Sequence, residues 1–149
     1  FVARQLVKHQ VGLVWNEVSR RYVDDEVEFY VPEDWRGAPE NSKQGSSSEV
    51  IDINPHNRMI DDYQQVCKKA KWTYEHLLSQ GVAPEQARMV LPQSMMTEWY
   101  WSGTLMAFAR VCNLRCKPDA QVETQMVADQ IDVLAKELFP NSWEALRDV

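Results

Sequence analysis

The sequence predicts one helix-rich α+β domain over residues 1–149, with a small β-sheet formed early in the chain. Three observations lead to this prediction. The 149 residues are the size of one ordinary domain, and 44% of them are hydrophobic against 26% charged. Two long segments after residue 56 repeat apolar side chains at helical spacing. The alternating pattern typical of a strand occurs once, before residue 33.

The first third of the chain predicts a helix, a strand and a loop. A helix is favoured over residues 1–14, because four positions share one helical face: Val2, Leu6, His9 and Leu13. Residues 22–32 predict a half-buried strand that ends at Pro32, with its inward side chains at Val27, Phe29 and Val31. Residues 36–48 are rich in Gly, Pro, Asn and Ser, which predicts a mobile loop of a length that often carries function.

The middle of the chain predicts two helices. Residues 57–80 place apolar side chains at helical spacing, and Gly81 is a natural C-terminal stop for that helix. Pro84 then begins a short helix over residues 85–90, which Pro92 closes.

The last third predicts two further helices. Residues 97–114 are dense in aromatic side chains and predict a buried helix, with Arg115 at its end. A long amphipathic helix follows over residues 120–139, with Asp119 as its expected N-cap.

Composition and charge exclude several classes of partner and compartment. Sixteen Lys and Arg against 22 Asp and Glu give a net charge of −6, so we expect neither nucleic acid nor an anionic membrane as a partner. Three cysteines are too few for a disulfide framework, which favours a reducing compartment, the cytoplasm. Arg110 interrupts the longest apolar stretch before it could span a membrane. The chain starts at Phe1 without a signal pattern, so we expect it to lack part of its natural N-terminus.

Metal and thiol chemistry have little support in the sequence. The glycine-rich phosphate loops, the HExxH pattern and the EF-hand pattern do not occur. Cys112 and Cys116 are four residues apart, but no second Cys/His pair completes a zinc site, so we expect no metal. A nucleophilic cysteine would need a nearby base, and the sequence nominates none.

Three clusters of polar residues suit the recognition of a charged small molecule. In the run NEVSRRY, Arg21 can bind a phosphate through two hydrogen bonds, Ser19 can add a hydroxyl, and Glu17 can accept from a sugar or a base. Arg88 stands in a second cluster and Arg115 in a third, at a helix junction. Composition alone would favour a surface turn of solvated charges for the first cluster, and Arg115 could equally complement the end of its helix.

Together and in this order, the clusters resemble the flavin-dependent thymidylate synthase family. That family carries Arg-His-Arg followed by Asn-Glu-x-Ser-x-Arg-Tyr, and the run here is KHQVGLVWNEVSRRY. Its Ala-Arg-x-x-Leu-Pro stretch looks like residues 87–92, and its Thr-Glu-aromatic stretch looks like residues 97–100. Its Leu-Arg ahead of an Ala-Gln-x-Glu helix start looks like residues 114–115 and 120–123. Four ordered motifs over nearly the whole chain make the resemblance specific.

The resemblance implies the fold of that family, with a reductive methylation of dUMP to dTMP. Methylenetetrahydrofolate would give the carbon, and FAD reduced by NADPH would give the reducing equivalents. A homotetramer would assemble the sites between subunits. Matched positions imply dUMP contacts from Gln5, Glu17, Ser19, Arg21, Arg88 and Arg115, with Arg115 also catalytic through its charge. They imply flavin contacts from Lys8, His9, Gln10 and Asn16.

The chain departs from the family pattern near the flavin positions, and this keeps a second interpretation open. Lys8 and Gln10 replace the two arginines that flank the histidine, and the spacing from His9 to Asn16 is one residue longer. A relative that keeps the dUMP contacts but has lost flavin chemistry would be a non-catalytic nucleotide-binding or assembly protein. A third interpretation, an unrelated acidic helical interaction domain, would leave the arginines dispersed.

Overall fold

The computed structural model describes residues 1–18, 26–40, 45–47, 49–52 and 58–147, which form two compact units. Unit 1 comprises the described residues of Phe1–Asn16, Arg36–Val50 and Trp99–Val149. Unit 2 comprises those of Glu17–Trp35 and Ile51–Glu98. The predicted fold class, helix-rich with a small sheet, is confirmed. That residues 1–149 form a single domain stays a prediction.

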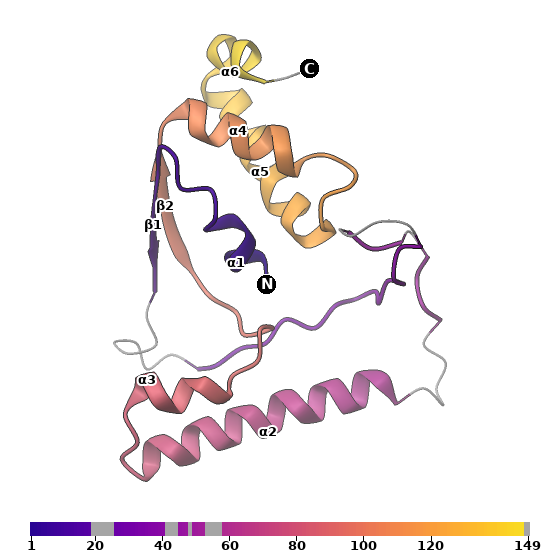
Figure 1. The fold of residues 1–149 in the computed structure, drawn as a ribbon, viewed down its shortest axis with the longest axis vertical. Coiled ribbons are helices and arrows are strands. Elements are labelled where there is room, and N and C mark those ends of the chain that lie inside the picture. The colour runs from indigo at the N-terminus through magenta and orange to yellow at the C-terminus, as the bar shows by residue number, and fades with distance from the viewer. Residues whose placement is uncertain (19–25, 41–44, 48, 53–57, 148–149) are drawn as a thin grey trace. The chain divides into compact units, whose positions relative to one another are not determined.

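Unit 1 is built mainly from helices near the end of the chain. Helices α4 (Leu105–Arg115) and α5 (Val122–Leu138) pack against each other, and α6 (Pro140–Leu146) packs on both, as Figure 1 shows. The short α1 (Val2–Leu6) packs against α5. The core of this bundle holds Ala109, Cys112 and Trp143, and the Trp143 indole Nε1 donates to Asp132 at 2.8 Å.

The C-terminal part of unit 1 differs from the prediction at the start of α5 and in the presence of α6. The helix over residues 120–139 is confirmed as α5, but it begins after Gln121 as its N-cap rather than at Asp119. Asp119 lies instead in the turn that the Ala120 amide closes on the Lys117 carbonyl. Helix α6 was not predicted, and it starts at Pro140, a residue favoured in the first helical turn.

The sheet consists of two antiparallel strands, β1 (Leu13–Glu17) and β2 (Trp99–Gly103), and all its residues except Glu17 belong to unit 1. Two predictions were therefore wrong: the first helix ends at Leu6, and the aromatic segment becomes helical only from Leu105. Aromatic pairing across the strands explains the difference. Trp15 stacks on Trp99 at 4.3 Å between ring centroids and meets Trp101 edge-on at 5.5 Å. Helical spacing along the chain cannot report such cross-strand contacts.

Close backbone approach at the end of the sheet requires a glycine. A Cβ atom on Gly103 would lie 2.3 Å from the Gly12 carbonyl oxygen and 2.6 Å from the side chain of Leu13. The Thr104 amide donates to the same carbonyl at 3.1 Å. Thr104 then caps α4, because its hydroxyl accepts from the Ala107 amide. The sheet therefore leads directly into the helix that ends at Arg115.

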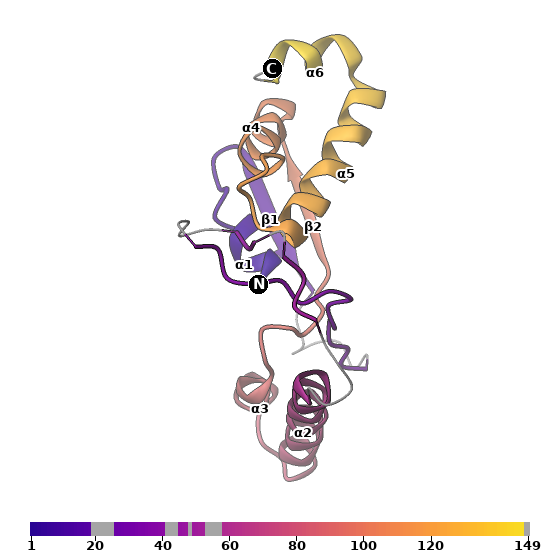
Figure 2. The same cartoon turned by 90° about the vertical axis from the view of Figure 1, so that its right-hand side faces the viewer.

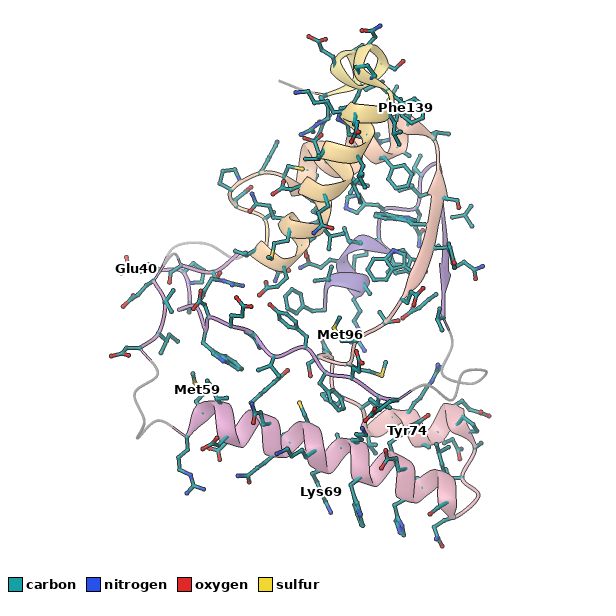
Figure 3. All side chains as sticks on the ribbon, turned by 180° about the vertical axis from the view of Figure 1, so that it is seen from behind. Glu40, Met59, Lys69, Tyr74, Met96 and Phe139 are labelled. Atoms are coloured by element: carbon teal, nitrogen blue, oxygen red, sulfur yellow. The ribbon has the colours of Figure 1, made fainter. Side chains whose placement is uncertain are left out.

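Unit 2 contains the long helix α2 (Met59–Ser79), the short α3 (Pro84–Ala87) and the 3₁₀ turn η1 (Arg88–Val90). These elements confirm the predicted helices over residues 57–80 and 85–90, with Gly81 at a φ of +81° after α2. Figures 1 and 2 both show α3 beside α2. Tyr74 lies on the side of α2 toward α3, whereas Lys69 points away from it (Figure 3). Tyr74, Val27 and Ala87 form the buried core of this unit.

The predicted strand over residues 22–32 is not a regular strand in the part that the structure describes. Residues 22–25 lie outside that part, and Phe29 forms a single antiparallel bridge with Met95. Val27 is buried as predicted, but Val31 is exposed. The pairing is short because a turn precedes Met95, whose amide donates to the Pro92 carbonyl at 3.0 Å.

The predicted loop over residues 36–48 is described only in part, because residues 41–44 and 48 lie outside the described residues. Arg36 bridges Val50, and the Ser47 amide donates to the Gly37 carbonyl at 2.9 Å. The mobility of this loop stays a prediction. Among the helices of the described residues, none is long and apolar enough to cross a membrane.

Candidate functional site

An arginine and a histidine that are far apart in sequence meet in unit 1. Arg115 is the last residue of α4, and its Nε donates a hydrogen bond to Nε2 of His9 at 3.1 Å. His9 stands just after α1, where its amide donates to the Leu6 carbonyl at 3.0 Å. Both side chains are half-buried. The pair is therefore held from two sides, by the end of α4 and by the turn after α1.

The direction of this hydrogen bond fixes the state of the imidazole. An arginine Nε can only donate, so Nε2 of His9 must be unprotonated and the ring proton must lie on Nδ1. Burial lowers the pKa of His9, and the nearby charges of Arg115 and Arg110 lower it further. His9 is thus a neutral acceptor at neutral pH. Among the described residues, nothing pairs with the two terminal amino groups of Arg115.

A second side-chain contact anchors α1. The hydroxyl of Thr124, a fully buried residue in the first turn of α5, donates to Oε1 of Gln5 at 2.7 Å. The contact joins residues 119 positions apart in sequence. The amide nitrogen of Gln5 has no partner among the described residues. Gln5 can therefore still donate to a ligand while its carbonyl holds the helix in place.

The three remaining positions assigned to flavin carry exposed side chains. Lys8 and Gln10 flank His9, and Asn16 lies on β1. Within the described part of the chain, none of these side chains forms a hydrogen bond or an ion pair. One cation and two amides thus stay available, which suits the phosphates and the ring carbonyl and N–H groups of FAD. The donor set fits the cofactor.

The other predicted nucleotide contacts belong to unit 2 or lie outside the described residues. The Glu17 carboxylate accepts from the Thr97 hydroxyl at 2.7 Å, and the Val18 amide donates to the Glu98 carbonyl at 2.8 Å. Arg88 is exposed in η1. Ser19 and Arg21 are among the residues that the structure does not describe. Gln5, His9 and Arg115 thus share unit 1, while Glu17 and Arg88 share unit 2.

Thr97, the partner of Glu17, and the ion pair of Glu123 with Arg36 were not predicted from the sequence. Thr97 and Glu123 stand inside the motifs that carry the family resemblance, so the sequence held a signal for both. Glu123 forms an ion pair with Arg36 at 2.5 Å, and Arg36 also donates to the Ser46 hydroxyl at 2.7 Å. No sequence signal links Arg36 to Glu123, because 87 residues separate them.

The cysteines of α4 and the turn after it are not poised for nucleophilic chemistry. Burial raises the pKa of Cys112 to about 12 and that of Cys116 to about 11. Both are protonated thiols at neutral pH, and the Cys112 thiol donates to the Ala128 carbonyl at 3.6 Å. Across the described residues, no group of three His, Cys, Asp or Glu side chains could hold a metal ion.

The fold and the site together define a class: a helix-rich α+β protein with a two-stranded sheet and a half-buried arginine–histidine pair at a helix end. The chain belongs to the Thymidylate synthase complementing protein family, which matches residues 1–141. The resemblance predicted from the motifs is thereby confirmed.

Similar proteins support this membership. A flavin-dependent thymidylate synthase of Thermus thermophilus is 37% identical over 148 residues, which cover 99% of this chain and 53% of the relative. One from Kosmotoga olearia is 37% identical over 145 residues, covering 97% of this chain and 62% of the relative. The chain thus spans little more than half the length of these relatives.

Solved structures show the same fold. The UMP/dUMP methylase PolB of Streptomyces cacaoi, bound with 5-Br UMP, has a TM-score of 0.80 and 28% identity, and the match covers 97% of this chain and 68% of that enzyme's chain. The same enzyme bound with 5-Br dUMP gives a TM-score of 0.79 and 30% identity, with 97% and 65% covered.

Proposed function

We propose that this protein is a flavin-dependent thymidylate synthase that methylates dUMP to dTMP. Methylenetetrahydrofolate would be the carbon donor, and NADPH would reduce the FAD cofactor. The names of the curated relatives support the proposal, as do the UMP and dUMP analogues bound to the structural neighbour. The single observation in this chain that carries it is the half-buried Arg115 guanidinium, held at Nε by His9 with its terminal amino groups unpaired among the described residues.

The chemistry of the pyrimidine explains why such an arginine is useful. Carbon C5 of the uracil ring must become nucleophilic, which places negative charge on the ring carbonyl oxygens and on N3. A guanidinium already oriented toward that edge stabilises the charge as it develops, without reorganisation during the reaction. Arg115 therefore acts as the catalytic residue. No thiolate is needed, in agreement with the raised pKa values of Cys112 and Cys116.

The remaining contacts divide by the chemistry of the nucleotide. Arg21 and Arg88 would bind the phosphate and Ser19 would add a hydroxyl donor. Glu17, oriented by Thr97, would accept from the sugar or the base. The free amide nitrogen of Gln5 would donate to the nucleotide.

FAD, when bound, supplies the reducing equivalents for a transferred one-carbon unit to become a methyl group. The charge of Lys8 would pair with a phosphate of the cofactor. The amides of Gln10 and Asn16 would donate to and accept from the ring system. His9 would face the same region through its Nδ1–H group.

A homotetramer in the cytoplasm is part of the same proposal. Exposed apolar side chains on and just after α5 suit a subunit interface: Met126, Val133, Leu134, Leu138 and Phe139. The cysteines of the described residues are all free, which suits a reducing compartment.

The first test is a titration of the purified protein with FAD, followed by visible absorption, with and without dUMP. We expect a flavin spectrum that changes on binding and changes again with dUMP, because both ligands share one site. UMP is the matched comparison, since the structural neighbour holds analogues of both nucleotides. Retained dUMP binding without any flavin binding would favour the non-catalytic nucleotide-binding alternative. The replacement of two family arginines by Lys8 and Gln10 is the observation that supports that alternative. Binding of neither ligand would contradict the proposed function.

The second test removes the charge of Arg115. Arg115→Leu should lower turnover by roughly 10²–10³-fold, the usual cost of one lost electrostatic donor in an active site. Arg58→Leu is the matched control, because it removes the same charge from an exposed residue at the start of α2. Normal NADPH oxidation and dTMP formation in Arg115→Leu would refute the catalytic assignment.

A further inference from the structure

His9, which the family motif assigns to the cofactor, contacts Arg115 in this chain. Nε2 of His9 is occupied by Nε of Arg115, so the ring cannot use that nitrogen for a flavin. Arginine has several rotatable bonds, and a hydrogen bond at Nε restricts the plane in which its terminal amino groups point. The contact therefore determines the direction of the donors that the proposed function needs.

Both partners of this hydrogen bond are anchored to α5. Arg115 ends α4, which packs along α5. His9 follows α1, whose Leu6 is fully buried and whose Gln5 is held by Thr124 of α5. One helix thus anchors the backbone on both sides of the contact between imidazole and guanidinium.

We propose that His9 is a positioning residue, whose neutral imidazole orients Arg115, so that the nucleotide site is competent only while His9 is unprotonated. This inference rests on the proposed function for its nucleotide. A protonated imidazole has no lone pair at Nε2, so it cannot accept from Arg115, and it places a second cation against the guanidinium.

The charged groups around His9 all lower its pKa. Arg115 and Arg110, both on α4, are the charged groups that face it, and among the described residues no carboxylate from α1 or α5 offsets them. Burial adds to the effect and lowers the pKa of His9. The imidazole is thus neutral at neutral pH, and protonation in acid would break the contact.

Two substitutions separate this role from a purely structural one. His9→Gln keeps an acceptor oxygen at a similar reach but cannot titrate, whereas His9→Leu removes the acceptor and keeps an apolar side chain of moderate size. Binding of dUMP to the full chain and turnover are measured from about pH 5 to pH 8. The phosphate of dUMP titrates in the same range, with a pKa near 6, so the informative quantity is the difference between the unmodified protein and His9→Gln.

We expect the unmodified protein to lose dUMP affinity in acid more steeply than His9→Gln does. At neutral pH, His9→Gln should bind dUMP within about 3-fold of the unmodified protein, and His9→Leu should bind it about 10-fold more weakly, as for one lost hydrogen bond to a charged group. Turnover should fall further than affinity in His9→Leu. Identical acid profiles in the unmodified protein and His9→Gln would overturn the inference, as would normal affinity and turnover in His9→Leu.

A measurement without nucleotide keeps this inference separate from the proposed function. Imidazole ¹⁵N spectra should show the proton of neutral His9 on Nδ1, and Arg115→Leu should raise the pKa of His9 toward its ordinary value. A proton on Nε2, or a pKa of His9 unchanged in Arg115→Leu, would overturn the inference even if the enzyme is active. A failure of both the unmodified protein and His9→Gln to bind dUMP at any pH would instead contradict the proposed function.

Discussion

Units 1 and 2 hold the side chains of the proposed site in different ways. In unit 1, Arg115 and Gln5 each have a side-chain partner that is itself half-buried or buried. In unit 2, Arg88 is exposed and Glu17 is held by a single hydroxyl. A guanidinium that is oriented in advance stabilises a developing charge better, because it need not reorganise during the reaction. A side chain that binds a phosphate can instead become ordered when the phosphate binds. The difference matches the proposed roles of Arg115 at the pyrimidine and of Arg88 at the phosphate.

The same contrast appears in the tryptophans of the two units. Trp143 of unit 1 is 1% exposed, packs among α4 and α5, and donates to Asp132. Trp72 of unit 2 is 53% exposed on α2, where it stacks on His76 and lies 4.0 Å below the Lys69 ammonium. One side chain is part of a core and the other covers a helix surface.

Replacing Trp143 should have the largest effect on stability. Trp143→Ala is expected to lower the free energy of unfolding by about 3–5 kcal/mol, because it leaves a cavity in the core and Asp132 without its indole donor. Trp72→Ala is the matched control and should cost less than about 1 kcal/mol. Chemical denaturation monitored by far-UV circular dichroism measures both. Equal losses in the two variants would contradict the contrast between the units.

Breaking the ion pair between Arg36 and Glu123 in unit 1 should have the next largest effect. The side chains of Arg36 and Glu123 are 23% and 13% exposed, so Arg36→Met leaves a half-buried carboxylate without its partner. We expect a loss of roughly 1–3 kcal/mol, between the values for surface and buried pairs. A double-mutant cycle with Glu123→Gln isolates the pair, and strictly additive losses would show that the contact contributes nothing.

Replacing Gly81, which follows the end of α2, should have a smaller effect on stability that comes from the backbone alone. Gly81 has a φ of +81°, and a Cβ atom there would meet no other atom within 4 Å. Gly81→Ala should therefore cost about 1 kcal/mol from the left-handed backbone alone. Gly81→Asn should cost less, because asparagine tolerates this conformation better. Thermal unfolding of the two variants tests the order, and a larger loss in the asparagine variant would argue against a backbone origin.

The smallest effect is expected at the ion pair of unit 2. The ammonium of Lys71 donates to Glu26 and lowers the pKa of that exposed carboxyl, chiefly through the hydrogen bond. A lowered pKa stabilises the fold only above the pKa of the unfolded state, and the contribution disappears as pH falls through the lowered value. Lys71→Met should return the pKa of Glu26 to its ordinary range with no measurable change in stability, since the pair is exposed to solvent. Carboxyl NMR titration measures the first and denaturation the second, and an unshifted pKa would contradict the contact.

Local pattern predicted the helices well and the strands poorly. Helices α2 and α5 and the stop at Gly81 follow from apolar periodicity and one glycine, which are properties of neighbouring residues. All of β2 and the first two residues of β1, Leu13 and Val14, were predicted as helix, because the strand that stabilises each of these segments lies far away in the sequence. Periodicity carries no information on such a partner. The contacts of Trp15 with Trp99 and Trp101 stabilise the two strands instead of a helix.

In the candidate site, too, the sequence predicted some features and only the structure showed others. The ordered motifs determined the family and nominated Arg115, His9 and Gln5, because residue type and order along the chain are enough for that. Only the tertiary structure decided that His9 accepts from Arg115 and that Thr124 holds Gln5, across 106 and 119 residues. The physical reason is that a hydrogen bond depends on atoms within about 3 Å and on the angle between them, and packing sets both.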